Sequence, residues 1–129
     1  MSGSCVAGAE EEQVIYERYE DERCKAVANA DKLTMTREKG SFKDVGSDRA
    51  FVCGPDRSGS PLGDGYDKET CAEACKTFKY FALQNPKGDK KLSQCFCGND
   101  YTAATKHGEQ SCGKTGAKFC NYIYERIKG

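Results

Sequence analysis

The residues best suited to chemistry in this chain are its cysteines, of which there are 9 among 129 residues. Four of the cysteines occur as two closely spaced sets. Cys71 and Cys75 lie four residues apart, and Cys95 and Cys97 lie two apart. On a helix, a spacing of four puts both side chains on one face, and on a strand a spacing of two does the same. We therefore expect a helix that carries Cys71 and Cys75 to lie on a strand that carries Cys95 and Cys97.

Two neighbouring disulfides are the chemistry that this pair of elements favours. Four helical residues rise about 6 Å and two strand residues about 6.7 Å, so the two sets of cysteines match in spacing. Closing loops of this length stabilises a fold by about 3–4 kcal/mol in the chain-entropy model. The direction of the helix decides the pairing, which spacing alone leaves open. We favour the nested arrangement, Cys71 with Cys97 and Cys75 with Cys95.

Zinc binding is the alternative use of the same four thiols. A C-x3-C and a C-x-C could supply a tetrahedral thiolate site, and the chain would then be an intracellular zinc-binding module. However, the spacing is not that of a C-x2-C knuckle, and the other cysteines would remain unexplained in a reducing compartment. We therefore predict disulfides, with no metal and no cofactor.

The other cysteines extend this disulfide prediction. We expect Cys24, Cys53, Cys112 and Cys120 to be bridged as well, either with a small Cys112–Cys120 loop or with links back to Cys24 and Cys53. An odd total leaves one thiol over, and we assign it to Cys5, which is either free or joins two copies as a disulfide-linked dimer. Because disulfides persist in oxidising compartments, we expect a secreted or extracellular protein, at a cell wall or cell surface.

Composition narrows the class of partner. The charges of the 20 basic and 20 acidic residues cancel, so the formal net charge is zero, and the mean hydropathy is −0.77. Without a basic stripe or an apolar stretch long enough to cross a bilayer, we expect neither nucleic acid binding nor membrane insertion. We expect residues 1–12 to be a flexible arm, with Met1–Ser4 partly left from cloning after removal of a signal peptide, and residues 13–129 to be a single domain.

Catalysis is not expected from these residues. The chain has 1 histidine, His107, in a Lys-His-Gly-Glu stretch typical of a solvated loop. No G-x-S-x-G or comparable nucleophile motif is present, so acid–base and covalent catalysis lack their usual groups. We predict that the protein is not an enzyme.

The secondary-structure pattern predicts an α+β fold with an antiparallel sheet. A helix should begin after Asp67 as N-cap and run through Lys76 or Thr77. The N-terminal part, over Glu10–Lys32, fits a helix or an edge strand equally well, and residues 40–65 read as a long loop. The predicted strands are a short one at Arg49–Cys53 and three longer ones at Lys79–Gln84, Ser93–Cys97 and Lys118–Arg126.

A family resemblance covers the C-terminal half. The run from Asp67 contains TCAEAC, then Tyr80-Phe81-Ala82-Leu83, then Cys95-Phe96-Cys97-Gly98-Asn99, and finally Cys112-Gly113 through Cys120 to Tyr124. This order resembles the WSC domain, clearest over residues 67–125. The resemblance implies a small disulfide-stapled fold of the PAN/apple type, in which a curved antiparallel sheet cradles a helix. An extra N-terminal helical or loop elaboration would be specific to this chain.

The WSC resemblance implies a secreted, lectin-like module that binds glycan or polysaccharide of a cell wall or cell surface. Sugar sites combine aromatic faces with amide and carboxylate groups that bind hydroxyls. An extracellular protein-interaction or adhesion module of the apple type is the alternative. The residues expected to bind the ligand are Tyr80, Gln84, Asn99, Asp100, Tyr101, Asn121 and Tyr122.

Overall fold

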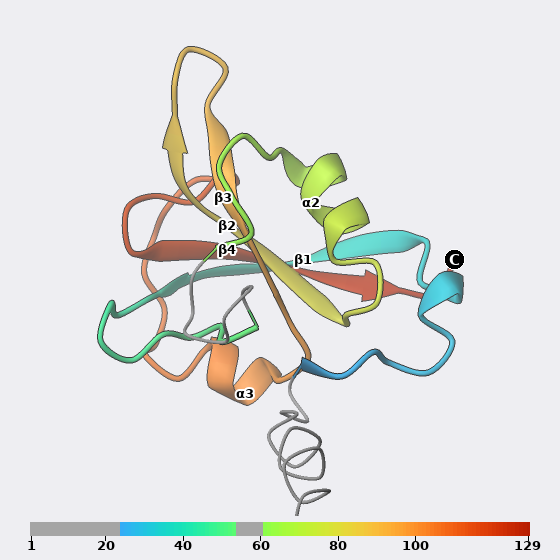
Figure 1. The fold of residues 1–129 in the computed structure, drawn as a ribbon. Helices are drawn as coiled ribbons and strands as arrows, with labels where there is room; N and C mark the ends of the chain where they lie inside the picture. The colour runs from blue at the N-terminus through green and yellow to red at the C-terminus, as the bar shows by residue number, and fades with distance from the viewer. Residues whose placement is uncertain (1–23, 54–60) are drawn as a thin grey trace, which may run out of the picture.

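The structure, a computed structural model, describes residues 24–53 and 61–129. Two short helices, α2 (Lys68–Ala74) and α3 (Tyr101–Ala104), accompany a 3-10 turn, η2 (Ala30–Lys32). An antiparallel sheet in the order β1-β4-β2-β3 is formed by β1 (Met35–Lys43), β2 (Tyr80–Lys87), β3 (Leu92–Gly98) and β4 (Cys120–Ile127) (Figure 1). The α+β fold with an antiparallel sheet is therefore confirmed.

Several N-terminal expectations fall outside the described residues. These are the arm at 1–12, the odd cysteine Cys5 and most of the predicted helix or strand at Glu10–Lys32. Within that last range, the structure describes the 3-10 turn η2 near its end.

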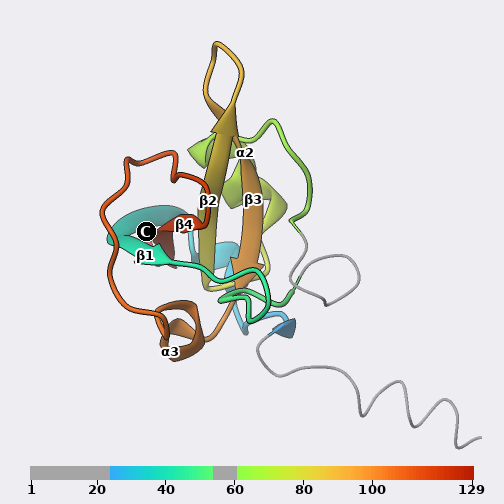
Figure 2. The same cartoon turned by 90° about the vertical axis from the view of Figure 1, so that its left-hand side faces the viewer.

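The sheet carries apolar side chains on both faces. α2 lies over one face and α3 lies against the other (Figures 1 and 2). On the α3 side the core consists of Phe42, Ala50, Phe51, Ala82, Phe96, Ala104 and Ile123. On the α2 side it consists of Phe81, Leu83, Tyr124, Cys71, Cys75, Cys95 and Cys97. Phe119 lies within the range Lys118–Arg126 that was predicted as a strand, but it precedes β4 in a turn with φ of 53° and is 41% exposed.

Helix α2 begins where the sequence predicts. Asp67 accepts a hydrogen bond of 2.8 Å from the Thr70 amide, and the Thr70 hydroxyl accepts one of 2.8 Å from the Asp67 amide, which completes a capping box. The helix ends at Ala74 rather than at Lys76 or Thr77. Its end is set by tertiary packing, since the chain turns after Cys75 to bring Phe78 onto the α2-side core.

The two central disulfides do not have the nested pairing that we favoured. Cys71 is bonded to Cys95 and Cys75 to Cys97, so the first cysteine of the helix meets the first cysteine of the strand. The nested arrangement would need the helix to run the opposite way along β3. All four sulfur-bearing residues are buried, which makes these bridges part of the core.

The remaining described cysteines form two further bridges. Cys24 is joined to Cys53, and Cys112 to Cys120. The small-loop alternative for Cys112 and Cys120 is therefore the one adopted. All eight cysteines predicted to be bridged are bridged, which is compatible with an extracellular protein.

Strand β1 was not predicted. Its residues, MTREKGSFK, are polar, and its last four lie inside the range read as a long loop. The strand exists because its backbone pairs with β4, from Met35 opposite Ile127 to Lys43 opposite Cys120. A bulge between Glu38 and Gly40 also breaks the alternation that identifies a strand from sequence.

The short strand expected at Arg49–Cys53 is absent. This segment instead places Ala50 and Phe51, both buried, against the α3-side core. A Cβ atom on Gly98 would lie 2.7 Å from the Phe51 ring, so glycine at the end of β3 makes room for that ring. An apolar run of this kind fits a buried loop as well as a strand.

Candidate binding groove

A groove lies between α2 and the chain that leads into β1. It encloses about 950 Å³, which is within the size range of small-molecule sites. Its residues come from three places: the segment before and at the start of β1, one face of α2 with the turn after it, and β4. They are Ala30, Asp31, Leu33, Thr34, Met35, Thr36, Lys68, Glu69, Ala72, Glu73, Lys76, Thr77 and Arg126.

One wall of the groove is helix α2. Lys68 and Ala72 are four residues apart and so lie on one side of the helix, with Glu69 and Glu73 beside them, and Lys76 lines the groove from the turn after the helix. The ammonium of Lys76 lies 3.7 Å from the carboxylate of Glu73, and both side chains are mostly exposed. The two buried disulfides hold α2 on β3, so this wall has a fixed position relative to the sheet.

The opposite wall is the segment from Ala30 to Thr36. Leu33 and Met35 give it an apolar surface, and Met35 is 55% exposed. Near the C-terminus, the amide of Gly129 donates a hydrogen bond of 3.4 Å to the carbonyl of Lys32. This wall is therefore tied to the chain beyond β4 as well as to β4 itself.

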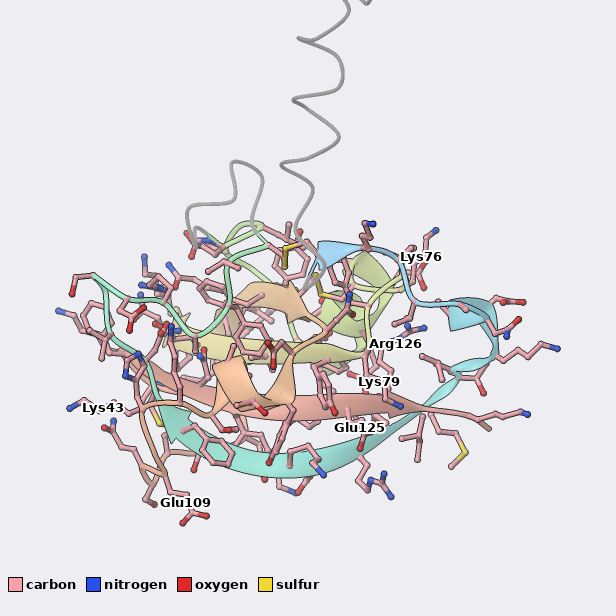
Figure 3. All side chains as sticks on the ribbon, turned by 90° about the horizontal axis from the view of Figure 1, so that it is seen from below. Lys43, Lys76, Lys79, Glu109, Glu125 and Arg126 are labelled. Carbon is pink, nitrogen blue, oxygen red and sulfur yellow. A yellow bond between two sulfur atoms is a disulfide. The ribbon has the colours of Figure 1, made fainter. Side chains whose placement is uncertain are left out.

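Arg126 forms the floor and joins the two walls. Its Nη1 donates hydrogen bonds of 2.7 Å and 2.8 Å to the carbonyls of Lys76 and Phe78 beyond α2. Its Nη2 donates bonds of 3.4 Å and 2.8 Å to the carbonyls of Ala30 and Leu33. Figure 3 shows Arg126 beside Lys76. Burial lowers the pKa of this guanidinium, an effect that the charge of Glu73 partly opposes.

The surface that remains for a ligand is amphipathic. Both Nη atoms of Arg126 donate to backbone carbonyls, so its contribution to a ligand is mainly its charge. Around the apolar side chains stand carboxylates, ammonium groups and hydroxyls, which offer hydrogen-bond acceptors and donors on both walls. The charged groups are three carboxylates, on Asp31, Glu69 and Glu73, and three cations, on Lys68, Lys76 and Arg126.

Two tyrosines continue the same face of β4 beyond the groove. The ammonium of Lys68 lies 5.8 Å from the centre of the Tyr124 ring. Burial, together with the charge of Glu38, raises the pKa of Tyr124 to about 12. The Tyr122 hydroxyl donates a hydrogen bond of 3.0 Å to Glu38, whose carboxylate also pairs with Lys114 at 2.9 Å. Tyr122, one of the predicted ligand residues, therefore lies on the groove side of the sheet but outside the groove.

The structure brings together four other predicted residues on the α3 side. The rings of Tyr80 and Tyr101 are 5.4 Å apart, and Asn99 and Asp100 adjoin Tyr101. These groups already have internal roles: Asp100 caps α3 by accepting from the Ala103 amide, and Asn99 accepts from the Lys79 amide at 2.8 Å and donates to the Lys25 carbonyl.

The ring of Tyr101 does not present an open face to a sugar. The Tyr80 ring lies next to it at a tilt of 31°, the Phe42 ring is nearly perpendicular to it with centroids 6.3 Å apart, and the ammonium of Lys39 lies 5.0 Å from its centre. Tyr80 and Tyr101 were both expected to bind the ligand, and the contacts that the structure gives them are those of packing.

Gln84 and Asn121 are buried, which contradicts their assignment to a ligand surface. Asn121 is 0% exposed, and its Oδ1 accepts a hydrogen bond of 2.7 Å from Gln84 Nε2. The same Nε2 donates at 2.9 Å to Asp44, a buried carboxylate that also accepts from the Ala50 amide at 2.8 Å. These residues fix the loop after β1 to the sheet. The alternation of side chains along β2 and β4 did not indicate that Asp44 and the loop after β1 cover Gln84 and Asn121.

Three sulfur atoms lie close enough to suggest a metal site. Those of Cys71, Cys75 and Cys95 are all within 4.8 Å of one another. Metal binding by cysteine requires the thiolate, whereas here each sulfur belongs to a disulfide. The bridged cluster is therefore a structural element of the core.

Sequence reasoning did not identify the groove residues. They are separated along the chain and have no motif spacing, except that Lys68, Ala72 and Lys76 are four residues apart. That repeat, with charge at either end and a small residue between, is the one signal that could have indicated a helix wall beside an open space.

In the part of the chain that the structure describes, no helix has the length and apolar character to cross a membrane. No protein-family model matches the sequence, and neither a curated protein nor a solved structure matches it significantly.

Proposed function

We propose that the chain is an extracellular, WSC-like glycan-binding module that holds its ligand in the groove between α2 and the start of β1. The sequence resemblance over residues 67–125 supports this assignment, and so does a sheet with a helix bonded to it by two disulfides. The four described disulfides support an oxidising location. A PAN/apple-like relationship is part of the same proposal.

The observation that carries the proposal is the chemical character of the groove. Saccharides present apolar C–H patches surrounded by hydroxyls that both donate and accept hydrogen bonds. The groove offers a matching arrangement, with Ala72 and Leu33 as apolar contacts and Glu73 and Lys76 as an adjacent acceptor and donor. Because the carboxylates and cations of the groove balance, a neutral glycan suits it better than a strongly charged ligand.

Binding to an array of cell-wall and cell-surface oligosaccharides is the first test. Any glycan that binds should then be titrated by calorimetry and by amide chemical shifts. We expect the largest shifts at α2 and at residues 30–36. A complete absence of binding to neutral oligosaccharides, or shifts confined to the Tyr80–Tyr101 side, would reject the proposal.

A double variant tests the groove directly. Glu73→Ala with Lys76→Ala removes one acid and one base from the groove and should weaken binding about tenfold or more, as loss of two charged hydrogen-bonding groups implies. The matched control is Lys43→Ala with Glu109→Ala, which removes the same two charges at the other end of the molecule (Figure 3). This control should bind as the parent chain does.

A protein-interaction module is the second candidate. It is favoured by one specific observation, an uncovered stretch of backbone along the edge of the sheet.

A further inference from the structure

The two edge strands of the sheet are β1 and β3, and other segments of the chain form backbone hydrogen bonds with most of their outer sides. Along β3, the segment 62–66 forms backbone hydrogen bonds with Ser93 and Cys95, at 2.8–3.3 Å. Along the second half of β1, the amide of Lys43 donates to Gly108 at 2.9 Å, and the carbonyl of Ser41 accepts from Gln110 at 3.2 Å. Among residues 24–53 and 61–129, none forms a backbone hydrogen bond to the outer side of Met35–Lys39.

Backbone direction identifies the groups on this uncovered edge. The Arg126 amide donates to the Lys79 carbonyl at 2.7 Å, so the backbone of Arg126 faces β2. Its neighbour Glu125 therefore faces β1, where it is opposite Arg37. By alternation, the N–H and C=O groups of Thr36 and Glu38 point away from the sheet. An extended peptide could pair with them as a fifth strand.

Side chains next to this edge carry a surplus of positive charge. The Glu125 carboxylate lies 2.9 Å from Arg37, 3.2 Å from Lys79 and 3.8 Å from Lys39, so one acid faces three cations. Burial alone would raise the pKa of Glu125, but its hydrogen bonds with Arg37 and Lys79 reverse this and leave the pKa lowered. The side chain of Arg37 is 59% exposed, and its Nε and Nη2 both donate to Glu125, which lies opposite it on β4.

This charge distribution selects the kind of partner. A second copy pairing through its own β1 edge would bring Arg37 and Lys39 against the same residues of the other chain, and like charges opposed across strands are destabilising. An acidic strand would instead place carboxylates beside these cations. Because side chains on one face of a strand alternate, the acidic residues of the partner should be two apart.

We propose that the outer edge of β1 from Met35 to Lys39 binds an extended acidic segment of another protein by strand addition, with alternate Asp or Glu residues beside Arg37 and Lys39. The site shares Met35 and Thr36 with the wall of the glycan groove, but it uses the outward-facing backbone of Thr36 and Glu38, and it does not depend on glycan binding. Backbone pairing would provide affinity, and the cations would provide selectivity for acidic sequences.

The test uses a fluorescent, end-capped peptide of alternating Glu and Val, titrated against the full chain by anisotropy and by amide chemical shifts. We expect saturable binding, with shifts at Thr36 and Glu38, that weakens at high salt. A peptide with Lys in place of Glu should not bind. The double variant Arg37→Gln with Lys39→Gln should lose about tenfold in affinity if each cross-strand charge pair has its usual strength.

A backbone variant separates strand addition from simple charge attraction. Thr36→Pro removes an N–H that points away from β4, a position that an edge strand tolerates. It should reduce binding strongly, whereas Thr36→Val should not. Equal binding by both variants, or shifts away from β1, would overturn the proposal. A gain of peptide affinity on deletion of residues 1–22 would also overturn it, by assigning the edge to the chain's own acidic N-terminal sequence.

Discussion

The guanidinium of Arg126 donates a hydrogen bond of 2.8 Å to the backbone carbonyl of Leu33, 93 residues earlier in the chain. Through its other nitrogen it also binds the carbonyls of Lys76 and Phe78. A single buried cation thus connects β4, the turn after α2 and the segment before β1. Since hydrogen bonds from charged donors are the stronger kind, this residue has a large share in holding the groove open at a fixed width.

Replacing this residue should loosen the groove. Arg126→Met keeps most of the side-chain volume but leaves the four carbonyls without their donor. We expect a loss of about 3 kcal/mol in the free energy of unfolding, measured by denaturant titration, because four partly buried carbonyls lose a charged donor together. Any glycan affinity should fall as well.

Arg126→Lys is the informative companion variant, since it keeps the charge but loses the planar fork. The free energy of unfolding of Arg126→Lys should lie between those of the parent chain and Arg126→Met. Arg37→Met removes an exposed arginine from the same sheet and should cost about 1 kcal/mol or less. If Arg126→Met proved no more harmful than Arg37→Met, the role given to Arg126 would be wrong.

The disulfide pairing can be read directly from digested, non-reduced protein. Cleavage after Glu73 separates Cys71 from Cys75, and cleavage after Phe96 separates Cys95 from Cys97. Mass spectrometry should then find the Cys71 peptide attached to Cys95 and the Cys75 peptide attached to Cys97. Recovery of Cys71 with Cys97 would instead support the nested pairing and a reversed helix.

Removing a bridge between α2 and β3 should lower the free energy of unfolding more than removing the Cys112–Cys120 bridge. Replacing both Cys71 and Cys95 with alanine removes a bridge between residues 24 apart, which frees the unfolded chain, and should lower the free energy of unfolding by about 3–4 kcal/mol. The small loop between Cys112 and Cys120 restricts the unfolded chain less, so its removal should cost about 2–3 kcal/mol. Thermal unfolding of the two variants under non-reducing conditions gives the comparison.

Gly116 should not tolerate a side chain. Its φ is +76°, and a Cβ atom there would overlap the carbonyl oxygen of Leu83. We expect Gly116→Ala to lower the free energy of unfolding by about 3 kcal/mol, from backbone strain and displacement of β2. Gly113→Ala is the control, because nothing lies within 4 Å of a Cβ at that position. Similar melting temperatures for the two variants would contradict the packing described for Gly116.

Tyr124 should be the last tyrosine to ionise. Burial raises its pKa from 10.0 to about 12. Because the folded state favours the neutral phenol, its contribution to stability is complete below pH 10 and is lost as the pH rises through about 12. An ultraviolet titration of phenolate should show a late transition that Tyr124→Phe removes and Tyr122→Phe leaves in place. Ionisation of all tyrosines together near pH 10 would count against the burial of Tyr124.

Local features of the sequence were sufficient for several parts of the fold. The start of α2 follows from the hydrogen bonds that Asp67 and Thr70 make within four residues of each other. Strands β2, β3 and β4 follow from short runs of aromatic and other apolar residues bounded by turn sequences, and the facing of the cysteine pairs follows from helix and strand periodicity. Each of these depends on interactions between near neighbours, which composition and spacing report.

Other parts depend on contacts between distant residues. Strand β1 is stabilised by pairing with β4, far away along the chain, as the Arg37–Glu125 hydrogen bond between residues 88 apart illustrates. Gln84 and Asn121 look like surface residues in sequence, and they are buried because Asp44 and the loop after β1 cover them. No local pattern reports the partner that turns a polar residue inward.

The sequence by itself determined that this is a disulfide-rich α+β chain in which a cysteine-bearing helix lies on a cysteine-bearing strand. Only the tertiary structure decided how the helix runs along that strand, and therefore which sulfurs meet. It also decided the two surfaces proposed for binding, since the groove joins α2, Arg126 and the approach to β1, and the free edge is what remains after other segments cover the sheet. Spacing fixes which way neighbouring side chains face, whereas the relative direction and coverage of elements depend on the packing of the whole chain.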